Sequence, residues 1–206
     1  MRSACDRTGF PLIEIPEAGL EAHLLPVTKL QFERFLAEPN EFGDHWYATV
    51  LAVHERVSWR HFTDEDRERL FLGAVLPAEA AAFAAWMGPG FGLPSVQEWR
   101  GVYGSLRSEI LTSAKLAALR SKICAAAWTV VERLLDQLHP RSLFDLSLMN
   151  GGMVEWARQD KTHVGLGAPR PEFCPNLWDP RAEVVRPLRP AERLGHFGFR
   201  LVKRGR

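Results

Sequence analysis

The chain has 206 residues, of which 46% are hydrophobic and 25% are charged, and its formal net charge is +1. No run approaches the roughly 20 apolar residues of a membrane-spanning helix, and the start lacks a signal-peptide pattern. The three cysteines, Cys5, Cys124 and Cys174, are odd in number and far apart in the chain, which does not suggest a disulfide framework and fits reduced thiols. We therefore expect a cytoplasmic protein with no membrane partner, folded as one domain over residues 1–206.

Charge is unevenly distributed along the chain. Residues 1–156 hold 15 Lys+Arg and 20 Asp+Glu, whereas residues 157–206 hold 11 and 5. Such asymmetry can mark a surface for an acidic partner or a nucleic acid. Alternatively, these arginines cap carbonyls and pair with carboxylates on other segments. No basic cluster is interleaved with stacking aromatics, so a nucleic acid is the weaker possibility.

The first third of the chain predicts short strands followed by a helix. Residues Phe10–Leu25 form short extended pieces separated by Pro11 and Pro16. Thr28 is a suitable N-cap for a helix that must end near Pro39. The apolar stripe expected on that helix comprises Leu30, Phe32, Phe35 and Leu36.

The middle of the chain predicts further helices. Proline at the start, strong helix formers and a closing Gly-Pro-Gly predict a helix over Pro77–Met87. Ser95 can cap another helix that includes Trp99. Over residues 105–138, apolar residues recur at three-, four- and seven-residue intervals, which predicts one or two amphipathic helices. The last segment, 141–206, has frequent Gly and Pro and ends in the strand-like HFGFRLVKR, which indicates loops held by a small sheet.

Five motifs, in the same order, resemble the formylglycine-generating enzyme and sulfatase-modifying-factor family. They are LPVTKLQFERFL (residues 25–36), LGAVLPAEAAAFAAWMG (72–88), GLPSVQEWR (92–100), FDLSLMNGGMVEW (144–156) and GFRLV (198–202). The resemblance implies an α+β, C-type-lectin-like fold, rich in loops and held by a small antiparallel sheet. The stretch at about 105–138 is then a helical insertion, because the same region is mainly loop in catalytic members.

The resemblance assigns the motif residues to the scaffold. They are Leu93, Pro94, Glu98, Trp99, Glu155, Trp156, Gly198, Phe199 and Arg200. We expect Glu98 and Glu155 to accept hydrogen bonds from loop amides and arginines, with a buried carboxylate beside Arg200. The alternative is that the two glutamates act as a general acid and base. Where the family has GNVWEW this chain has GGMVEW, and Gly92 replaces an arginine, so no calcium ligand is carried over.

The family's catalytic site is expected to be missing. Catalytic members hold copper(I) with two cysteines, and soft thiolates suit that ion. The corresponding stretch, Thr162–Trp178, contains only Cys174. A second catalytic branch binds iron through histidines, but His45, His54 and His61 are spaced at nine and seven residues, unlike ligands on one helical face.

Two smaller possibilities for the cysteines also remain. Cys174 with His163 or His196 could form a nucleophilic pair, since such partners need only be close in space. Cys124 lies on a predicted amphipathic helix, where a free cysteine usually packs as a small apolar residue. We expect no bound metal and no cofactor.

The sequence thus favours a non-catalytic recognition or assembly module that binds a protein or peptide partner. The expected contact groups lie in the Gly/Pro-rich segment 162–196 and are Arg170, Phe173, Trp178, Asp179, Arg181, Arg186 and His196. One alternative is a diverged metal-dependent oxidase acting on a cysteine-containing peptide. A second is a structural subunit that forms oligomers through helices 105–138, in which charged substitutions of Leu134 and Leu135 would break the assembly and leave the fold intact.

Overall fold

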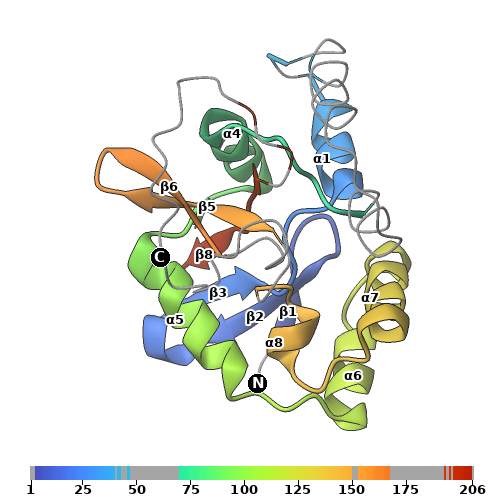
Figure 1. Ribbon diagram of the computed structural model, residues 1–206. Helices are drawn as coiled ribbons and strands as arrows, with labels where there is room; N and C mark the ends of the chain where they lie inside the picture. The colour runs from blue at the N-terminus through green and yellow to red at the C-terminus, as the bar shows by residue number, and fades with distance from the viewer. Residues whose placement is uncertain are drawn as a thin grey trace.

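A computed structural model of the chain describes residues 3–39, 41–42, 46, 70–149, 153–167, 193, 195 and 197–205. The α+β prediction is confirmed, with helices and two small sheets (Figure 1). The helices are α1 (Lys29–Leu36), α4 (Pro77–Met87), α5 (Val96–Arg107), α6 (Ser113–Arg120), α7 (Ala125–Leu138), α8 (Leu143–Leu146) and the 3-10 turn η1 (Pro16–Ala18). The strands are β1 (Ser3–Cys5), β2 (Pro11–Ile15), β3 (Leu20–His23), β4 (Phe91–Gly92), β5 (Val154–Gln159), β6 (Thr162–Leu166), β7 (Phe197–Gly198) and β8 (Val202–Arg204).

The larger sheet joins the two ends of the chain. Its strand order is β1-β2-β3-β8-β4, and every pair in it is antiparallel. Strand β3 near the N-terminus pairs with β8 near the C-terminus, with Ala22 opposite Val202. Alternation places Ile13, Ile15 and Leu20 toward the core, where α5 lies along β2 and η1 (Figure 1).

The smaller sheet corrects the expectation of a single antiparallel sheet. Its order is β6-β5-β7, and β5 pairs with β7 in parallel. The strand-like C-terminal stretch is divided, because β7 belongs to this sheet and β8 to the larger one. Residues 199–201 connect the two sheets, and all three are buried. The closing motif therefore bridges the sheets.

The predicted caps of the helices are present. Thr28 and Ser95 each accept a hydrogen bond from the backbone at the third helical position and complete a capping box. The predicted apolar stripe of α1 was wrong at one position, because Leu30 is 36% exposed and Gln31 is buried in its place. Gln31 turns inward because its side-chain oxygen accepts a hydrogen bond from the Thr28 amide, and its amide donates to Asp6.

The predicted helical insertion consists of two amphipathic helices. Residues Ser105–Arg107 belong to the end of α5, so the separate helices begin only at Ser113. Leu134 is completely buried in the core beside α8, and Leu135 packs against the same core. A charge at Leu134 would therefore disrupt the fold as well as any assembly, which corrects the expectation that the fold would survive it.

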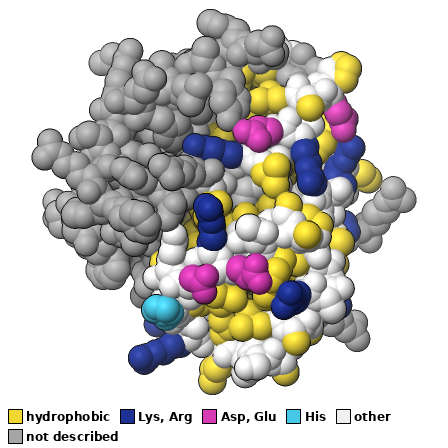
Figure 2. Space-filling model, turned by 90° about the vertical axis from the view of Figure 1, so that its right-hand side faces the viewer, with side chains coloured by type: hydrophobic (Ala, Val, Ile, Leu, Met, Phe, Trp, Pro, Cys, Tyr) yellow, Lys and Arg dark blue, Asp and Glu magenta, His cyan; other side chains and the backbone are white. Residues whose placement is uncertain are grey.

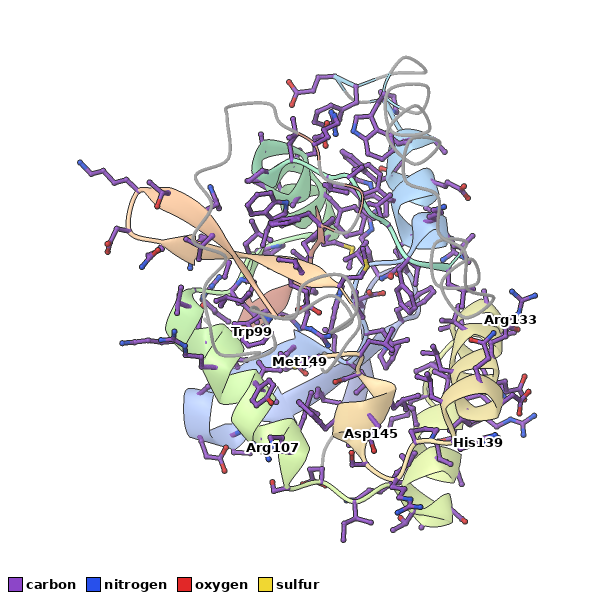
Figure 3. All side chains as sticks on the ribbon, viewed as in Figure 1. Trp99, Arg107, Arg133, His139, Asp145 and Met149 are labelled. Carbon is purple, nitrogen blue, oxygen red and sulfur yellow. The ribbon has the colours of Figure 1, made fainter. Side chains whose placement is uncertain are left out.

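The outer side of the helical pair mixes residue types. Figure 2 shows this side of the molecule, where hydrophobic side chains are interrupted by charges of both signs. Figure 3 places Arg133 of α7 at the outer edge of the molecule, His139 at the end of α7, and Trp99 of α5 on the inner side of its helix. No helix within the described ranges is long and apolar enough to cross a bilayer.

Candidate functional site

Arg200 is completely buried and binds three distant parts of the chain. Its guanidinium donates to both carboxylate oxygens of Glu155 on β5, at 3.0 and 2.8 Å. It also donates to the carbonyl oxygens of His23, Leu24 and Ser147. The indole N–H of Trp99 on α5 donates to Glu155 at 2.9 Å. All the donors of the arginine are therefore used, which is how a buried charge is tolerated.

Glu98 forms a second, partly exposed arginine site. Its carboxylate accepts two hydrogen bonds from Arg204 on β8, each 2.7 Å long, and one from the Ser95 amide. Arg204 also donates to the Leu93 carbonyl, and so does Arg158, which lies 3.8 Å from the Glu98 carboxylate. Burial raises the pKa of Glu98, but Arg204 and Ser95 outweigh it and lower the pKa to about 2.

Glu79 and Arg193 form a third pair that sequence reasoning missed. Arg193 donates to both oxygens of Glu79 at the start of α4 and to the Ala74 carbonyl. The only signal was a first-turn glutamate together with the surplus of arginines in the last quarter. Arg193, Arg200 and Arg204 each bind a glutamate and at least one carbonyl. For these three, the pairing interpretation of the charge asymmetry is correct.

The remaining motif residues are also part of the scaffold. The indole N–H of Trp156 donates to the Val75 carbonyl at 2.7 Å. An added Cβ at Gly198 would lie 2.7 Å from the Leu72 carbonyl oxygen, so only glycine fits there without a shift. Phe199 is completely buried and packs edge-on against Phe83 and Phe32 of the second core cluster. Pro94 accepts a hydrogen bond from the Arg158 amide.

Neither motif glutamate is arranged for proton transfer. Glu155 and Glu98 are each bound by their own arginine, Arg200 and Arg204. A general acid needs a proton near neutral pH, and the lowered pKa of Glu98 keeps its carboxylate ionised there. The arrangement favours the scaffold interpretation over an acid and base pair.

Asp6 and His23 form a buried acid–imidazole contact with no sequence signal. Asp6 Oδ2 lies 3.2 Å from His23 Nε2 without the geometry of a hydrogen bond, and it accepts one from Gln31. The other oxygen accepts from the Thr8 hydroxyl and from the Thr8 and Phe10 amides. Burial raises the pKa of Asp6, but the contacts with His23, Thr8 and Phe10 outweigh it and leave the pKa below its usual value. Asp6 thus attaches the loop after β1 to His23 on β3 and to Gln31 on α1.

The expected binding residues lie outside the part of the chain that the structure describes. They are the seven candidate contact groups Arg170, Phe173, Trp178, Asp179, Arg181, Arg186 and His196. The same holds for Cys174, His45, His54 and His61. Among the residues that are described, no group of three or more His, Cys, Asp or Glu side chains could hold a metal ion.

The remaining cysteines and His163 lie in separate places. Cys5 is exposed on β1. Cys124 caps α7, where its sulfur accepts from the Ala127 amide and its thiol donates to the Thr8 carbonyl. His163 lies on β6 opposite Arg158, and burial together with that arginine lowers the pKa of the imidazole. Cys124 thus caps a helix, in addition to packing.

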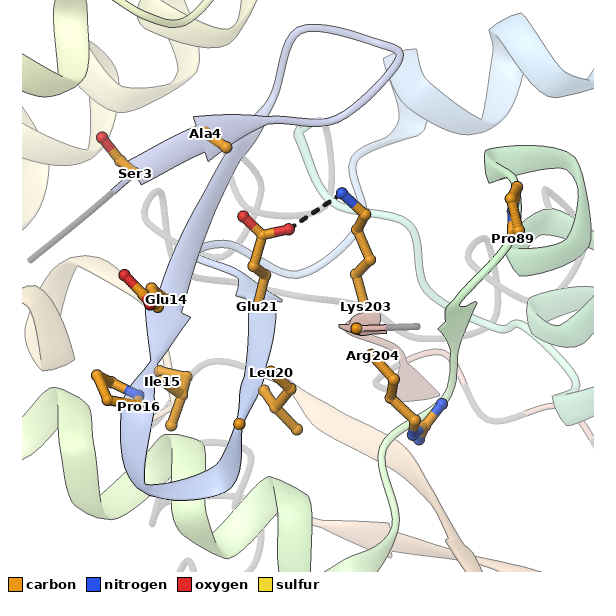
Figure 4. A pocket seen from close by; sticks show the side chains of 12 residues that line it. Ser3, Ala4, Glu14, Ile15, Pro16, Leu20, Glu21, Pro89, Lys203 and Arg204 are labelled. Carbon is orange, nitrogen blue, oxygen red and sulfur yellow. Dashed lines mark hydrogen bonds and ion pairs between the residues drawn. The ribbon is translucent and has the colours of Figure 1, made fainter.

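A groove crosses the outer face of the five-stranded sheet (Figure 4). Its volume is about 810 Å³, within the usual range for ligand sites. The lining residues are Ser3, Ala4, Glu14, Ile15, Pro16, Gly19, Leu20, Glu21, Pro89, Lys203, Arg204 and Gly205. They come from β1, β2, β3, β8 and the turn before β4, so distant parts of the chain build it together.

The groove carries charged side chains that lie in register across its strands. Glu14 is directly opposite Glu21, and Glu21 is directly opposite Lys203, whose ammonium lies 3.1 Å from the Glu21 carboxylate. The lining contains no cysteine or histidine. An open, charged surface of this kind suits recognition of a ligand.

Comparison of the chain with protein-family models, with curated proteins and with solved structures finds no match.

Proposed function

We propose that this chain is a non-catalytic recognition module with the formylglycine-generating-enzyme-like, C-type-lectin-like fold, and that it binds a protein or peptide partner. The observation that carries the proposal is the groove across the five-stranded sheet. A groove of about 810 Å³ that is lined by apolar side chains, two glutamates, a lysine and an arginine can bind a polypeptide.

The family part of the proposal is supported by the motif residues. The resemblance assigns the motif residues to the scaffold, and Trp99 and Arg200 both bind the Glu155 carboxylate in the core. Strands β3 and β8, from the two ends of the chain, pair with each other. Arg200 ties β3, β5, α5 and α8 together at one buried point. Such a core can carry variable surface loops, and the seven contact groups of segment 162–196 stay predictions within this proposal.

A peptide selection tests the proposal. The full chain is used to select from a displayed library of random heptapeptides, and the affinities of the selected peptides are measured for two variants. An added Cβ meets no heavy atom within 4 Å at Gly205, which lines the groove, or at Gly104 on α5, which does not. We expect Gly205→Trp to weaken binding by about tenfold or more and Gly104→Trp to leave it unchanged. Equal binding by both variants would show that the groove is not the binding surface.

The oxidase alternative has its own measurement. Copper(I) affinity of the reduced chain is measured by competition with a chromophoric chelator, alongside Cys174→Ser. The recognition module predicts no tight binding that depends on Cys174. Tight one-to-one binding that the substitution removes would instead favour a diverged oxidase, because a thiolate is the ligand copper(I) prefers.

A further inference from the structure

Two arginines from different strands converge on one backbone carbonyl beside the start of α5. Arg158 on β5 donates from Nε to the Leu93 carbonyl oxygen at 3.0 Å, and Arg204 on β8 donates from Nη2 to the same oxygen at 3.1 Å. The backbone of Arg158 also forms a bridge with Ser95, the N-cap of α5, so the β5–β6 hairpin lies beside that helix (Figure 1). The two guanidinium groups are therefore held close together.

A single carboxylate serves both arginines. Glu98 accepts two hydrogen bonds from Arg204, whereas Arg158 Nη2 lies 3.8 Å from a Glu98 oxygen, too far for a hydrogen bond. The other charged groups of the hairpin turn, Asp160 and Lys161, are of opposite sign. Within the described part of the chain, this cluster therefore has more positive charge than its one carboxylate offsets.

Several donors of the two guanidinium groups are unused. Within the described ranges, both terminal nitrogens of Arg158 and Nη1 of Arg204 have no hydrogen-bond partner. The side chains of Arg158 and Arg204 are 48% and 34% exposed, so a ligand can reach them. A guanidinium presents its donors in a planar fork that matches the oxygens of a carboxylate or a phosphate group.

His163 adds a donor to the same face of the hairpin. It is directly opposite Arg158 in the register of β5 and β6, and its side chain is exposed. Opposite residues of antiparallel strands point to one face with Cβ atoms about 5 Å apart. Partial burial, together with the charge of Arg158, lowers the pKa of the imidazole, so near neutral pH the ring is uncharged and still offers one N–H.

We propose that Arg158, Arg204 and His163 form a binding site for an oxyanion, a carboxylate or a phosphate group of a ligand. The terminal nitrogens of Arg158 are the main contacts, and the other two side chains border the bound oxygens. The anion offsets the positive charge that Glu98 leaves uncompensated. This site goes beyond the proposed peptide groove, because an oxyanion needs no polypeptide to carry it.

Nuclear magnetic resonance of the full chain tests the site with two probes. Sodium phosphate and sodium acetate are each compared with sodium chloride at equal ionic strength, and the ring signals of His163 are followed at pH 7. We expect the probes to shift these signals saturably and chloride to leave them nearly unchanged. An effect of phosphate alone would assign the site to phosphate groups, and an effect of acetate alone would assign it to carboxylates.

Variants of Arg158 identify the main contact. Arg158→Gln should weaken binding of the probes about fivefold or more, and Arg158→Lys, which keeps the charge but loses the fork, should weaken it less. Arg133→Gln, at an exposed arginine on α7, is the matched control and should change nothing. A bound anion should also raise the pKa of His163 in the unchanged chain, because negative charge favours the imidazolium form.

Two results would overturn the inference. Equal shifts in chloride and in the probes would mean that the anions only screen charge, and unchanged affinity in both Arg158 variants would mean that the anion binds elsewhere. Neither measurement uses the peptide library or Gly205→Trp. Failure of the oxyanion site therefore leaves the proposed function standing, and failure of the peptide selection leaves this site standing.

Discussion

The Arg200 cluster and the row of Glu14, Glu21 and Lys203 are built from the same kinds of charge and lie on opposite sides of one sheet. In the cluster every donor of the arginine is bound and the residues are excluded from water. In the row the ion pair is about one-third to two-fifths exposed. Burial therefore decides whether such charges are fixed in the core or stay exposed to solvent.

The largest effect is expected from removing the buried arginine. Arg200→Met leaves the Glu155 carboxylate without its countercharge in the core, which should cost about 3 to 5 kcal/mol in the free energy of unfolding. Urea denaturation followed by circular dichroism measures it. Adding Glu155→Leu to the same chain removes the stranded charge, so the double variant should be more stable than Arg200→Met alone. The opposite order would contradict the role of the cluster.

A smaller loss is expected from a buried residue that carries no charge. Leu134→Ala deletes a completely buried side chain from the core beside α8 and should cost about 3 kcal/mol, with the molecular mass in solution unchanged. Denaturation and light scattering measure the two quantities. Leu135→Ala, at a partly buried position on the same helix, should cost less. A change of mass with unchanged stability would instead favour the oligomer hypothesis.

Glu98 lies between the two extremes of burial and gives a pH-dependent effect. Its pKa is about 2 in the folded chain against an ordinary value of 4.5, so its contribution is fully present above pH 4.5 and is lost as the pH falls toward 2. The contribution should be about 1 kcal/mol once solvent screening is allowed for. Between pH 6 and pH 2, the free energy of unfolding should fall less steeply for Glu98→Gln than for the unchanged chain; urea denaturation at several pH values measures this. Some pH dependence of the stability should persist in that variant, because the pKa of Asp6 is also lowered in the folded chain.

The smallest effect on stability is expected in the row. Glu21→Gln removes one exposed ion pair and relieves one like-charge contact, so the free energy of unfolding should change by less than about 0.5 kcal/mol. Thermal unfolding measures this change, with Asp136→Asn, which removes an exposed carboxylate on α7, as the control variant. A loss as large as that of Arg200→Met would mean that the row belongs to the scaffold, and the difference between the two regions would disappear.

Local sequence determined the helices and their caps. Thr28 and Ser95 cap α1 and α5, and proline and glycine bound α4, because these signals act within a few residues. The helical period also predicted one or two amphipathic helices over residues 105–138, and the structure has two, α6 and α7. Gln31 was the exception, since its burial depends on Asp6, a residue 25 positions away.

Tertiary structure alone decided the pairings and the groove. Arg193 with Glu79 and Asp6 with His23 are separated by 114 and 17 positions, and no local pattern relates them. Strands β3 and β8, near the two ends of the chain, meet only in the folded sheet, and Glu21 faces Lys203 only through that register. The sequence by itself determined most of the helical segments and which residues carry charge; α8 was missed, because it lies in the stretch 141–206 that the sequence predicted as loops and a small sheet. Which charges are buried in pairs, and which lie open on a sheet, was decided by contacts between distant segments, because burial is a property of the whole fold.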